Sequence, residues 1–266
     1  MCKDCGCSIT DHVEDEHEHH HHHEHSHDHS HEHQAAHETL AHNPQLNDKK
    51  TISVITKILD KNNHEADHNR AHLDAHNVLS INLMSSPGSG KTTLLENIAE
   101  LSDMRFCVIE GDLETSRDAD RIKEKGIPAY QIQTGSACHL DAFMVHKGLH
   151  HLPMDDMDVC FIENVGNLVC PASYDVGSHL NIVLVSIPEG SDKIEKYPVM
   201  FRQADLILIT KTDLIEYFDY DLEHEKKEAR KIKPNVDILE VNIKDKESIK
   251  QVIEWIKFKT DLMHQT

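Results

Sequence analysis

The chain changes its pattern of apolar and polar positions twice along its length. Residues 1–47 are polar and repetitive and contain almost no large apolar side chains. Such a segment buries too little surface to offset the entropy of ordering, so we expect a tail that is disordered without metal. Residues 48–77 carry apolar positions at helical spacing, which predicts a helical lead-in that packs on the core or on a second subunit. Residues 78–266 are expected to form the globular domain.

Within residues 78–266, short apolar runs alternate with amphipathic ones. Runs such as VLSINLM and ADLILIT are typical of strands buried on both faces, and runs such as TTLLENIAELS are typical of helices. This alternation predicts an α/β, Rossmann-like fold in which a mostly parallel sheet is flanked by helices. Ligands bind such sheets at the carboxyl ends of the strands, and each motif of this domain described below follows a predicted strand.

A glycine-containing loop, SSPGSGKTT, lies between the first predicted strand and a helix. Its backbone N–H groups would wrap nucleotide phosphates at the helix N-terminus, while Lys91 reaches the β and γ oxygens and Thr92 binds Mg²⁺. Ser85 stands where the G-x-x-x-x-G-K-[ST] pattern usually begins with glycine. The motif predicts a P-loop NTPase whose phosphate contacts come from Gly88, Ser89, Gly90, Lys91, Thr92 and Thr93.

A second nucleotide motif, LILITKTDL, includes a later buried strand and the loop after it. Asp213 can accept hydrogen bonds from guanine N1–H and the exocyclic amine, a pair of donors that adenine lacks, while the stem of Lys211 covers the base. The motif therefore favours GTP and makes residues 78–266 a GTPase (G) domain. The later loop that usually reads S-A-K is VNIK here, Asn242 to Lys244, so its contact with the base stays open.

Two carboxylates are expected beside the γ-phosphate. Asp112, in VIEGDLETSRDADR, and Glu163, in FIENVGN, each end a predicted strand. We expect Asp112 to bind Mg²⁺ together with Thr92 and to position the attacking water, and Glu163 to hold the metal shell. With Lys91, the two acids form the predicted catalytic set. Ordinary loop acids are the alternative interpretation of both.

Cysteine and histidine form a candidate metal site inside the predicted domain. Cys138 and His139 follow the third predicted strand, and Cys170 follows the fourth. If these strands end at one edge, an imidazole and two thiolates converge, a set that suits Zn²⁺ or Ni²⁺ and not Mg²⁺. The alternative is two small buried thiols and a helix-start histidine. Cys107 and Cys160 lie inside apolar strands and are expected to be core residues.

The N-terminal tail holds two further sets of soft ligands. Cys2, Cys5 and Cys7 are too closely spaced for a closed tetrahedral site, but three thiolates and the terminal amine could form the planar set that Ni²⁺ accepts. The His-rich stretch at 17–33 contains 11 histidines and indicates many weak metal sites. A purification tag is the alternative, although the run is interleaved with Glu, Asp and Ser.

Charge and composition narrow the possible partners. The chain has 266 residues, with 47 acidic against 27 basic side chains and a formal net charge of −20. This balance argues against nucleic acid or an anionic membrane as the main partner, because both favour a basic surface. No apolar run could span a bilayer and cysteines occupy the start, so we expect a cytoplasmic protein whose seven cysteines are thiols and metal ligands.

The chain resembles the hydrogenase nickel-incorporation GTPase family, HypB, in motifs that follow the family's order. They are MCKDCGC, SSPGSGKTTL, EGDLETSRDADRI, GSACHLDA, ENVGNLVCP, EGSDKIEKYPVMF and ITKTDL. The resemblance covers about residues 49–259 together with the first seven residues. It implies a cytoplasmic GTPase of the dimerising metal-carrier class, with a weak homodimer that depends on nucleotide and metal. It also implies delivery of Ni²⁺ to [NiFe]-hydrogenase large-subunit precursors with the partner HypA.

Carried over by position, the resemblance assigns two metal sites. One is a tight nickel site at Cys2, Cys5 and Cys7, and the other is a G-domain site for Ni²⁺ or Zn²⁺ at Cys138, His139 and Cys170. The alternatives are a nickel storage protein with a vestigial nucleotide domain, a urease-type nickel-insertion GTPase, and a cobalt or zinc carrier of the same superfamily. The motifs CKDCGC and CHLDA favour HypB over the urease-type protein and over the other carriers.

Overall fold

The computed structural model describes residues 49–112 and 117–265. The predicted tail at 1–47, with Cys2, Cys5, Cys7 and the His-rich stretch at 17–33, lies outside the described residues. The chain divides into two compact units, Met1–Val54 and Ile55–Thr266. The described part of the first unit is the opening of helix α1 (Lys49–Ala75), and the architecture below is that of the second unit.

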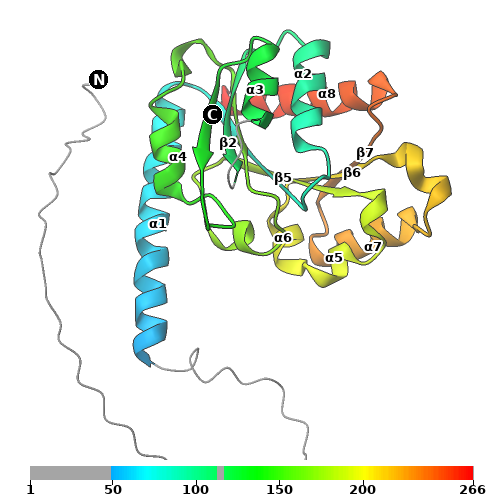
Figure 1. Ribbon diagram of the computed structural model, residues 1–266, viewed down its shortest axis with the longest axis horizontal. Helices are drawn as coiled ribbons and strands as arrows, with labels where there is room; N and C mark the ends of the chain where they lie inside the picture. The colour runs from blue at the N-terminus through cyan, green and yellow to red at the C-terminus, as the bar shows by residue number, and fades with distance from the viewer. Residues whose placement is uncertain (1–48, 113–116, 266) are drawn as a thin grey trace, which may run out of the picture. The chain divides into compact units, whose positions relative to one another are not determined.

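The seven strands of the described chain form one sheet in the order β3-β2-β4-β1-β5-β6-β7, and every neighbouring pair is parallel (Figure 1). The predicted parallel sheet is therefore confirmed. All strands in such a sheet present their carboxyl ends to one edge, where the motifs lie. The strands are β1 (Leu79–Ser85), β2 (Phe106–Asp112), β3 (Ala129–Gln133), β4 (Val159–Glu163), β5 (Leu180–Ser186), β6 (Leu206–Thr210) and β7 (Asp237–Val241).

Helices cover both faces of the sheet. Alternate residues of β1 enter different cores: Ile81 and Leu83 pack with α2, α3 and α8, whereas Met84 packs with α5, α6 and α7. A third core joins α1 and α4 to β2 and β4. The helices are α2 (Lys91–Leu101), α3 (Arg117–Glu124), α4 (Ala142–Leu149), α5 (Lys193–Lys196), α6 (Pro198–Gln203), α7 (Leu222–Ile232) and α8 (Lys246–Met263).

Cys107 and Cys160 belong to the core between α4 and the sheet, where both are fully buried free thiols. Their prediction as core residues is confirmed. The four cysteines of the described residues, the remaining two being Cys138 and Cys170, are all free. None of the described helices combines the length and the apolarity needed to cross a membrane.

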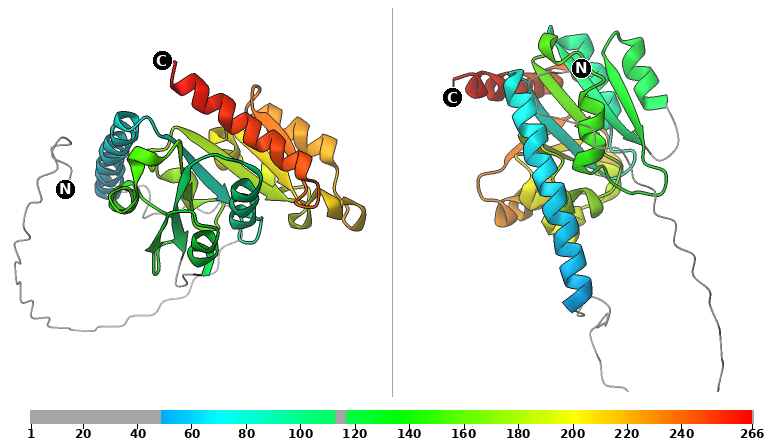
Figure 2. Two further views of the ribbon diagram at one scale, coloured as in Figure 1. Left: turned by 90° about the horizontal axis from the view of Figure 1, so that it is seen from above. Right: turned by 90° about the vertical axis from the view of Figure 1, so that its left-hand side faces the viewer.

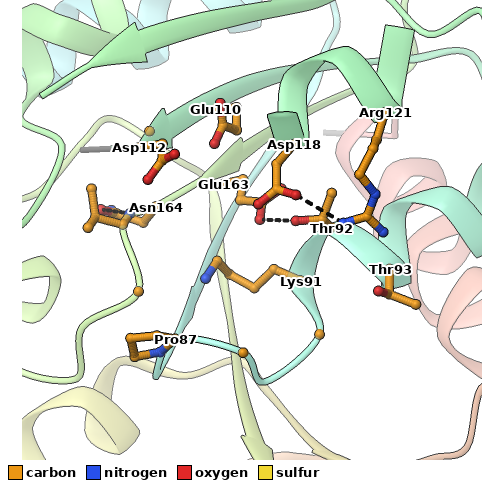
Figure 3. A pocket seen from close by; sticks show the side chains of 15 residues that line it. Pro87, Lys91, Thr92, Thr93, Glu110, Asp112, Asp118, Arg121, Glu163 and Asn164 are labelled. Carbon is orange, nitrogen blue, oxygen red and sulfur yellow. Dashed lines mark hydrogen bonds and ion pairs between the residues drawn. The ribbon is translucent and has the colours of Figure 1, made fainter. Parts of the chain in front are cut away.

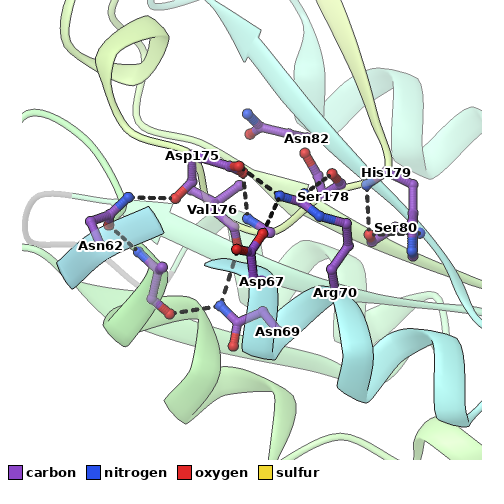
Figure 4. A network of polar contacts seen from close by, with 12 residues as sticks. Asn62, Asp67, Asn69, Arg70, Ser80, Asn82, Asp175, Val176, Ser178 and His179 are labelled. Carbon is purple, nitrogen blue, oxygen red and sulfur yellow. Dashed lines mark hydrogen bonds and ion pairs between the residues drawn. The ribbon is translucent and has the colours of Figure 1, made fainter. Parts of the chain in front are cut away.

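Helix α1 docks through polar side chains more than through the apolar face that the sequence pattern indicated. Arg70 donates from Nη1 to the Ser178 carbonyl oxygen (2.7 Å) and from Nη2 to Asp175 Oδ2 (2.7 Å), within the network of Figure 4. Ile55 and Ile58 remain 42% and 52% exposed in the single chain. The two isoleucines therefore lie on a part of the helix that the domain itself does not cover.

Candidate nucleotide and metal sites

The glycine loop turns directly from β1 into α2. Gly88 (φ +75°) and Gly90 (φ +103°) both adopt the left-handed region that side chains disfavour, and α2 begins at Lys91. Lys91 Nζ donates to Ser85 Oγ at 3.0 Å. The serine that replaces the usual first glycine thus supplies a polar acceptor for the lysine. A glycine loop at a helix N-terminus is a ready anion site.

Side chains from the ends of β5 and β6 hold the loop in place. Glu189, just after β5, accepts from Ser89 Oγ at 2.7 Å. Thr210, the last residue of β6, donates from Oγ1 to the Ser89 carbonyl oxygen at 2.8 Å, and Lys211 donates from Nζ to the Gly88 carbonyl oxygen at 2.7 Å. The base-side motif therefore touches the phosphate loop directly.

Acidic side chains gather opposite this loop in a pocket of about 350 Å³ (Figure 3). Glu163 accepts from Thr92 Oγ1 at 2.8 Å, and Asp112 lines the same pocket. Glu110 is the partner of Glu163 in the register of β2 and β4. Glu110 and Glu163 are only 2% and 4% exposed, and one carboxylate oxygen of each, Oε2, has no hydrogen-bond partner among the described residues.

Burial and mutual repulsion perturb these groups. Burial is the main cause that raises the pKa of Glu110 to about 8, and the nearby carboxylates of Glu163 and Asp112 raise it further. Burial also raises the pKa of Glu163, against the effect of Lys91, whose own pKa is lowered by burial. Buried carboxylate oxygens without partners are the donor set that Mg²⁺ prefers, so these residues fit the ion.

A second pocket of about 220 Å³ lies on the other side of the glycine loop. Lys211 (φ +59°) and Asp213 line it, with Leu214 and Ile243 among its apolar walls. Asp213 accepts a hydrogen bond from Lys244 Nζ at 2.6 Å. The VNIK loop, which stands where S-A-K is usual, therefore contacts the base motif. All eight predicted nucleotide contacts line one pocket or the other: Gly88, Ser89, Gly90, Lys91, Thr92, Thr93, Lys211 and Asp213.

The predicted inner metal ligands lie together in space. Cys138, His139 and Cys170 each present a ligand atom within 4.8 Å of the other two, although β2 lies between the strands that precede them. The His139 ring stacks on Tyr174 with centroids 3.9 Å apart. Burial lowers the pKa of His139, and the hydrogen bond with Cys138 raises the pKa of the Cys170 thiol. We call this set the thiol–imidazole site.

The loop after β4 connects this site to the phosphate pocket. Asn164, which lines the pocket, accepts from the backbone N–H of Leu140 at 3.1 Å. Three residues further on, Asn167 donates from Nδ2 to the Cys138 carbonyl oxygen at 3.4 Å. Both contacts hold the Cys138–Leu140 segment against the loop that runs from Glu163 to Cys170.

The sequence interpretation missed four polar side chains of the phosphate pocket: Glu110, Asp118, Arg121 and Asn164. Glu110 carried a readable signal, because it is an acid inside an apolar strand and lies two residues before Asp112, on the same face of β2. Arg121 donates to Asp118 (2.9 Å), three residues before it in α3, and to Glu96 of α2 (2.6 Å), a pair that no local pattern indicates.

A glycine loop between a parallel strand and a helix, followed by a lysine and a threonine that meet buried acids, defines a P-loop nucleotide-binding protein. Residues 79–240 match the family model described as CobW/HypB/UreG, nucleotide-binding domain. The chain belongs to this family and, within it, to the HypB hydrogenase and urease maturation factors.

Three relatives illustrate this membership. The chain is 50% identical to the hydrogenase/urease maturation factor HypB of Helicobacter hepaticus over 234 residues, 86% of this chain and 96% of that protein. It is 45% identical to the hydrogenase maturation factor HypB of Escherichia coli K12, covering 83% of this chain and 77% of that protein. The crystal structure of Helicobacter pylori HypB in complex with nickel superimposes with a TM-score of 0.74 at 44% identity, covering 76% and 95% of the two chains.

Proposed function

We propose that this protein is a GTP-hydrolysing nickel carrier that binds Ni²⁺ and delivers it during maturation of [NiFe]-hydrogenase in the cytoplasm. Its partners in this proposal are HypA, the hydrogenase large-subunit precursor and a second copy of the chain. Membership of a family of hydrogenase maturation factors supports the pathway, and the nickel complex of the Helicobacter pylori relative supports the metal.

The phosphate pocket would bind GTP and hydrolyse it to GDP and phosphate. Lys91 would hold the β and γ oxygens. Asp213 would accept hydrogen bonds from the guanine edge after its ion pair with Lys244 breaks. Thr92, Asp112 and Glu163 would hold Mg²⁺, which neutralises phosphate charge when bound. Asp112 would orient the attacking water.

The proposed coupling between nucleotide binding and nickel binding rests on one observation: the phosphate pocket and the thiol–imidazole site share the loop after β4. Glu163 begins this loop and contacts Thr92, and Cys170 ends it. Between them, Gly166 lies so close to the phosphate loop that an added Cβ would come within 2.8 Å of Pro87 Cα. A shift of the phosphate loop on GTP binding would therefore move the segment that carries the thiol of Cys170.

In this proposal the thiol–imidazole site holds Ni²⁺ or Zn²⁺ beside the nucleotide, and two protomers face each other across this edge. Cys2, Cys5 and Cys7 would form the tight nickel site, with the histidines of 17–33 as additional capacity; both lie outside the described residues. The nucleotide would time the release of the cargo, because moving a bound ion needs no phosphoryl transfer to a substrate.

The decisive experiment measures Ni²⁺ affinity in the full chain carrying Cys2→Ala, Cys5→Ala and Cys7→Ala, with GDP and with a non-hydrolysable GTP analogue. Linkage predicts different affinities in the two states, by about 5–150-fold. Adding Cys138→Ala and Cys170→Ser should remove the difference. Equal affinities in the two nucleotide states would contradict a nucleotide-controlled carrier and favour the storage alternative.

Urease maturation is a second candidate, because the Helicobacter relatives are named as hydrogenase/urease maturation factors. Nickel would be the common cargo. Activity of both enzymes in a strain that lacks this gene would separate the two destinations: loss of hydrogenase alone supports the first, and loss of both supports the wider role.

A further inference from the structure

A row of histidines follows the seam between α1 and α4 and uses none of the residues of the nucleotide pockets or the thiol–imidazole site. His68 and His72 on α1 and His76, just after the end of the helix, recur at four-residue intervals, and His146 of α4 is followed by His150 at the helix C-cap. This spacing places each set on one face of its helix. The two helices lie side by side (Figures 1 and 2).

The two rows face each other at contact distance. The ring centroids of His68 and His146 are 5.7 Å apart, and those of His72 and His150 are 5.3 Å apart. Within α4, the rings of His146 and His150 lie 4.6 Å apart. Four imidazoles from two helices therefore meet at one seam.

The nitrogen and oxygen atoms at this seam have the spacing of a metal site. Glu65, His68 and His146 each present a ligand atom, and the three atoms lie within 4.8 Å of one another. Glu65 Oε1 lies 3.2 Å from His146 Nδ1, which is the separation expected of two ligand atoms at adjacent positions around one ion, because each bond to the metal is about 2.0–2.2 Å long. The other ring nitrogen of His146, Nε2, lies 3.0 Å from His150 Nε2.

The backbone beneath this cluster is fixed. Asn69 donates from Nδ2 to the Ala142 carbonyl oxygen (2.8 Å), and Asn62 Oδ1 accepts from the Ala142 backbone N–H (2.9 Å). Asn69 Oδ1 and Glu65 Oε1 lie 3.0 and 3.2 Å from His146 Nδ1. These contacts orient the His146 ring, but they do not account for the imidazoles gathered around it. Oriented ligands of this kind are typical of metal sites.

We propose that the α1–α4 seam binds a divalent transition-metal ion of the Ni²⁺ or Zn²⁺ class through His146, Glu65 and His68. Imidazole with one carboxylate suits these ions and not Mg²⁺. A bound ion would tie α1 to α4, the helix that begins three residues after His139. The inference does not depend on the proposed function.

The test uses the full chain in a metal buffer, which fixes the free Ni²⁺ or Zn²⁺ concentration whatever the other sites take up. Diethylpyrocarbonate modifies accessible imidazoles, and mass spectrometry reports the rate at each histidine. As free metal rises, His68 and His146 should become protected several-fold, at lower concentrations than His64 and His151. His64 is an exposed neighbour on α1, and His151 is an exposed neighbour of His150.

Substitutions then identify the ligands. In His146→Gln, protection of His68 should require about 10-fold more metal or more, the cost of losing one ligand contact. Glu65→Gln should weaken protection in the same direction, and His64→Gln should not change it. Circular dichroism and GDP binding verify the fold of each variant, and His68→Gln provides a second test if His146→Gln unfolds. Protection of His68 and His146 at the same metal concentration as His64, or unchanged in the folded ligand variants, would overturn the proposal.

Discussion

The phosphate pocket and the thiol–imidazole site share one loop but are built in opposite ways. Lys91 and Thr92 at the start of α2 are 9% and 7% exposed, and Glu110 and Glu163, which face them, are more deeply buried. Cys138 lies on a loop, Cys170 begins a 3-10 turn at the end of another loop, and both are half-buried. Ends of regular elements fix the first set, and hydrogen bonds between two loops position the second.

This difference matches what each site would have to do. A site that stabilises developing charge needs groups that are oriented in advance and shielded from water. A site that takes up and releases cargo needs ligands that a partner can reach, and loops on a rigid scaffold provide them. The loop from Glu163 to Cys170 connects the phosphate pocket with the thiol–imidazole site. Substitutions in either site therefore test how far the two sites are independent.

The largest effect is expected for Lys91→Ala. Removing one oriented charge from the phosphate pocket should lower single-turnover GTP hydrolysis by about 100–1000-fold. Ni²⁺ binding at the thiol–imidazole site without nucleotide should persist, because Lys91 contacts none of its residues in the described structure. Lys123→Ala, an exposed lysine of α3, is the matched control. Unchanged hydrolysis would remove Lys91 from the site, and lost nickel binding would show that the two sites are one unit.

Glu110→Gln should flatten the pH dependence of stability. The pKa of Glu110 is about 8 in the folded chain against 4.5 for the free group. Between these values the folded chain keeps a proton that the unfolded chain has released, so the free energy of unfolding falls as pH rises. The loss should be on the order of 3 kcal/mol from about pH 5 to 8, in nucleotide-free protein with a chelator.

Urea unfolding at several pH values measures this slope. Glutamine keeps the size and the neutral state of the protonated acid, so the variant should lose much less stability at high pH. Glu124→Gln, an exposed acid of α3, should keep the wild-type slope. Equal slopes in wild type and Glu110→Gln would mean that Glu110 is ionised in the folded chain at neutral pH.

Asp213→Asn should change the preferred base. The carboxylate can accept from both guanine donors, whereas the amide can pair with the second keto group of xanthine, so GTP should lose affinity relative to XTP by about 100-fold or more. Competition binding with labelled GDP measures the ratio. Lys244→Met, which removes only the exposed partner of Asp213, should have a smaller effect. Asp219→Asn is the control, and an unchanged preference would exclude Asp213 from the base pocket.

The sequence predicted those parts of the sites that rest on local rules. The glycine loop, the two acids at the ends of β2 and β4, and the T-K-x-D loop after β6 are each readable from a strand and the residues behind it. The parallel sheet then brings them to one edge, as the alternation of elements predicts.

What could not be predicted depends on contacts across the fold. Glu110 is readable as an acid inside an apolar strand, but its neighbour is not, because only the pairing of β2 with β4 places Glu163 beside it. Helices α5 and α6, of four and six residues, are too short to show a period. The pair between Lys244 and Asp213 joins residues 31 positions apart.

The smallest effect is expected for Cys170→Ser, which tests the loop side of the comparison. Serine keeps the size of the side chain but replaces a soft thiolate with a hydroxyl that binds Ni²⁺ poorly, so metal affinity at the thiol–imidazole site should fall by about 10-fold. Because Cys138 and His139 remain, a weaker site should persist. The measurement is Ni²⁺ titration of the full chain carrying alanine at Cys2, Cys5 and Cys7. Ser173→Ala changes the same 3-10 turn without removing a ligand and should bind as the parent does. Equal affinity in Cys170→Ser would mean that this thiol is not a ligand. The loop after β4 would then not couple the metal site to the phosphate pocket through Cys170.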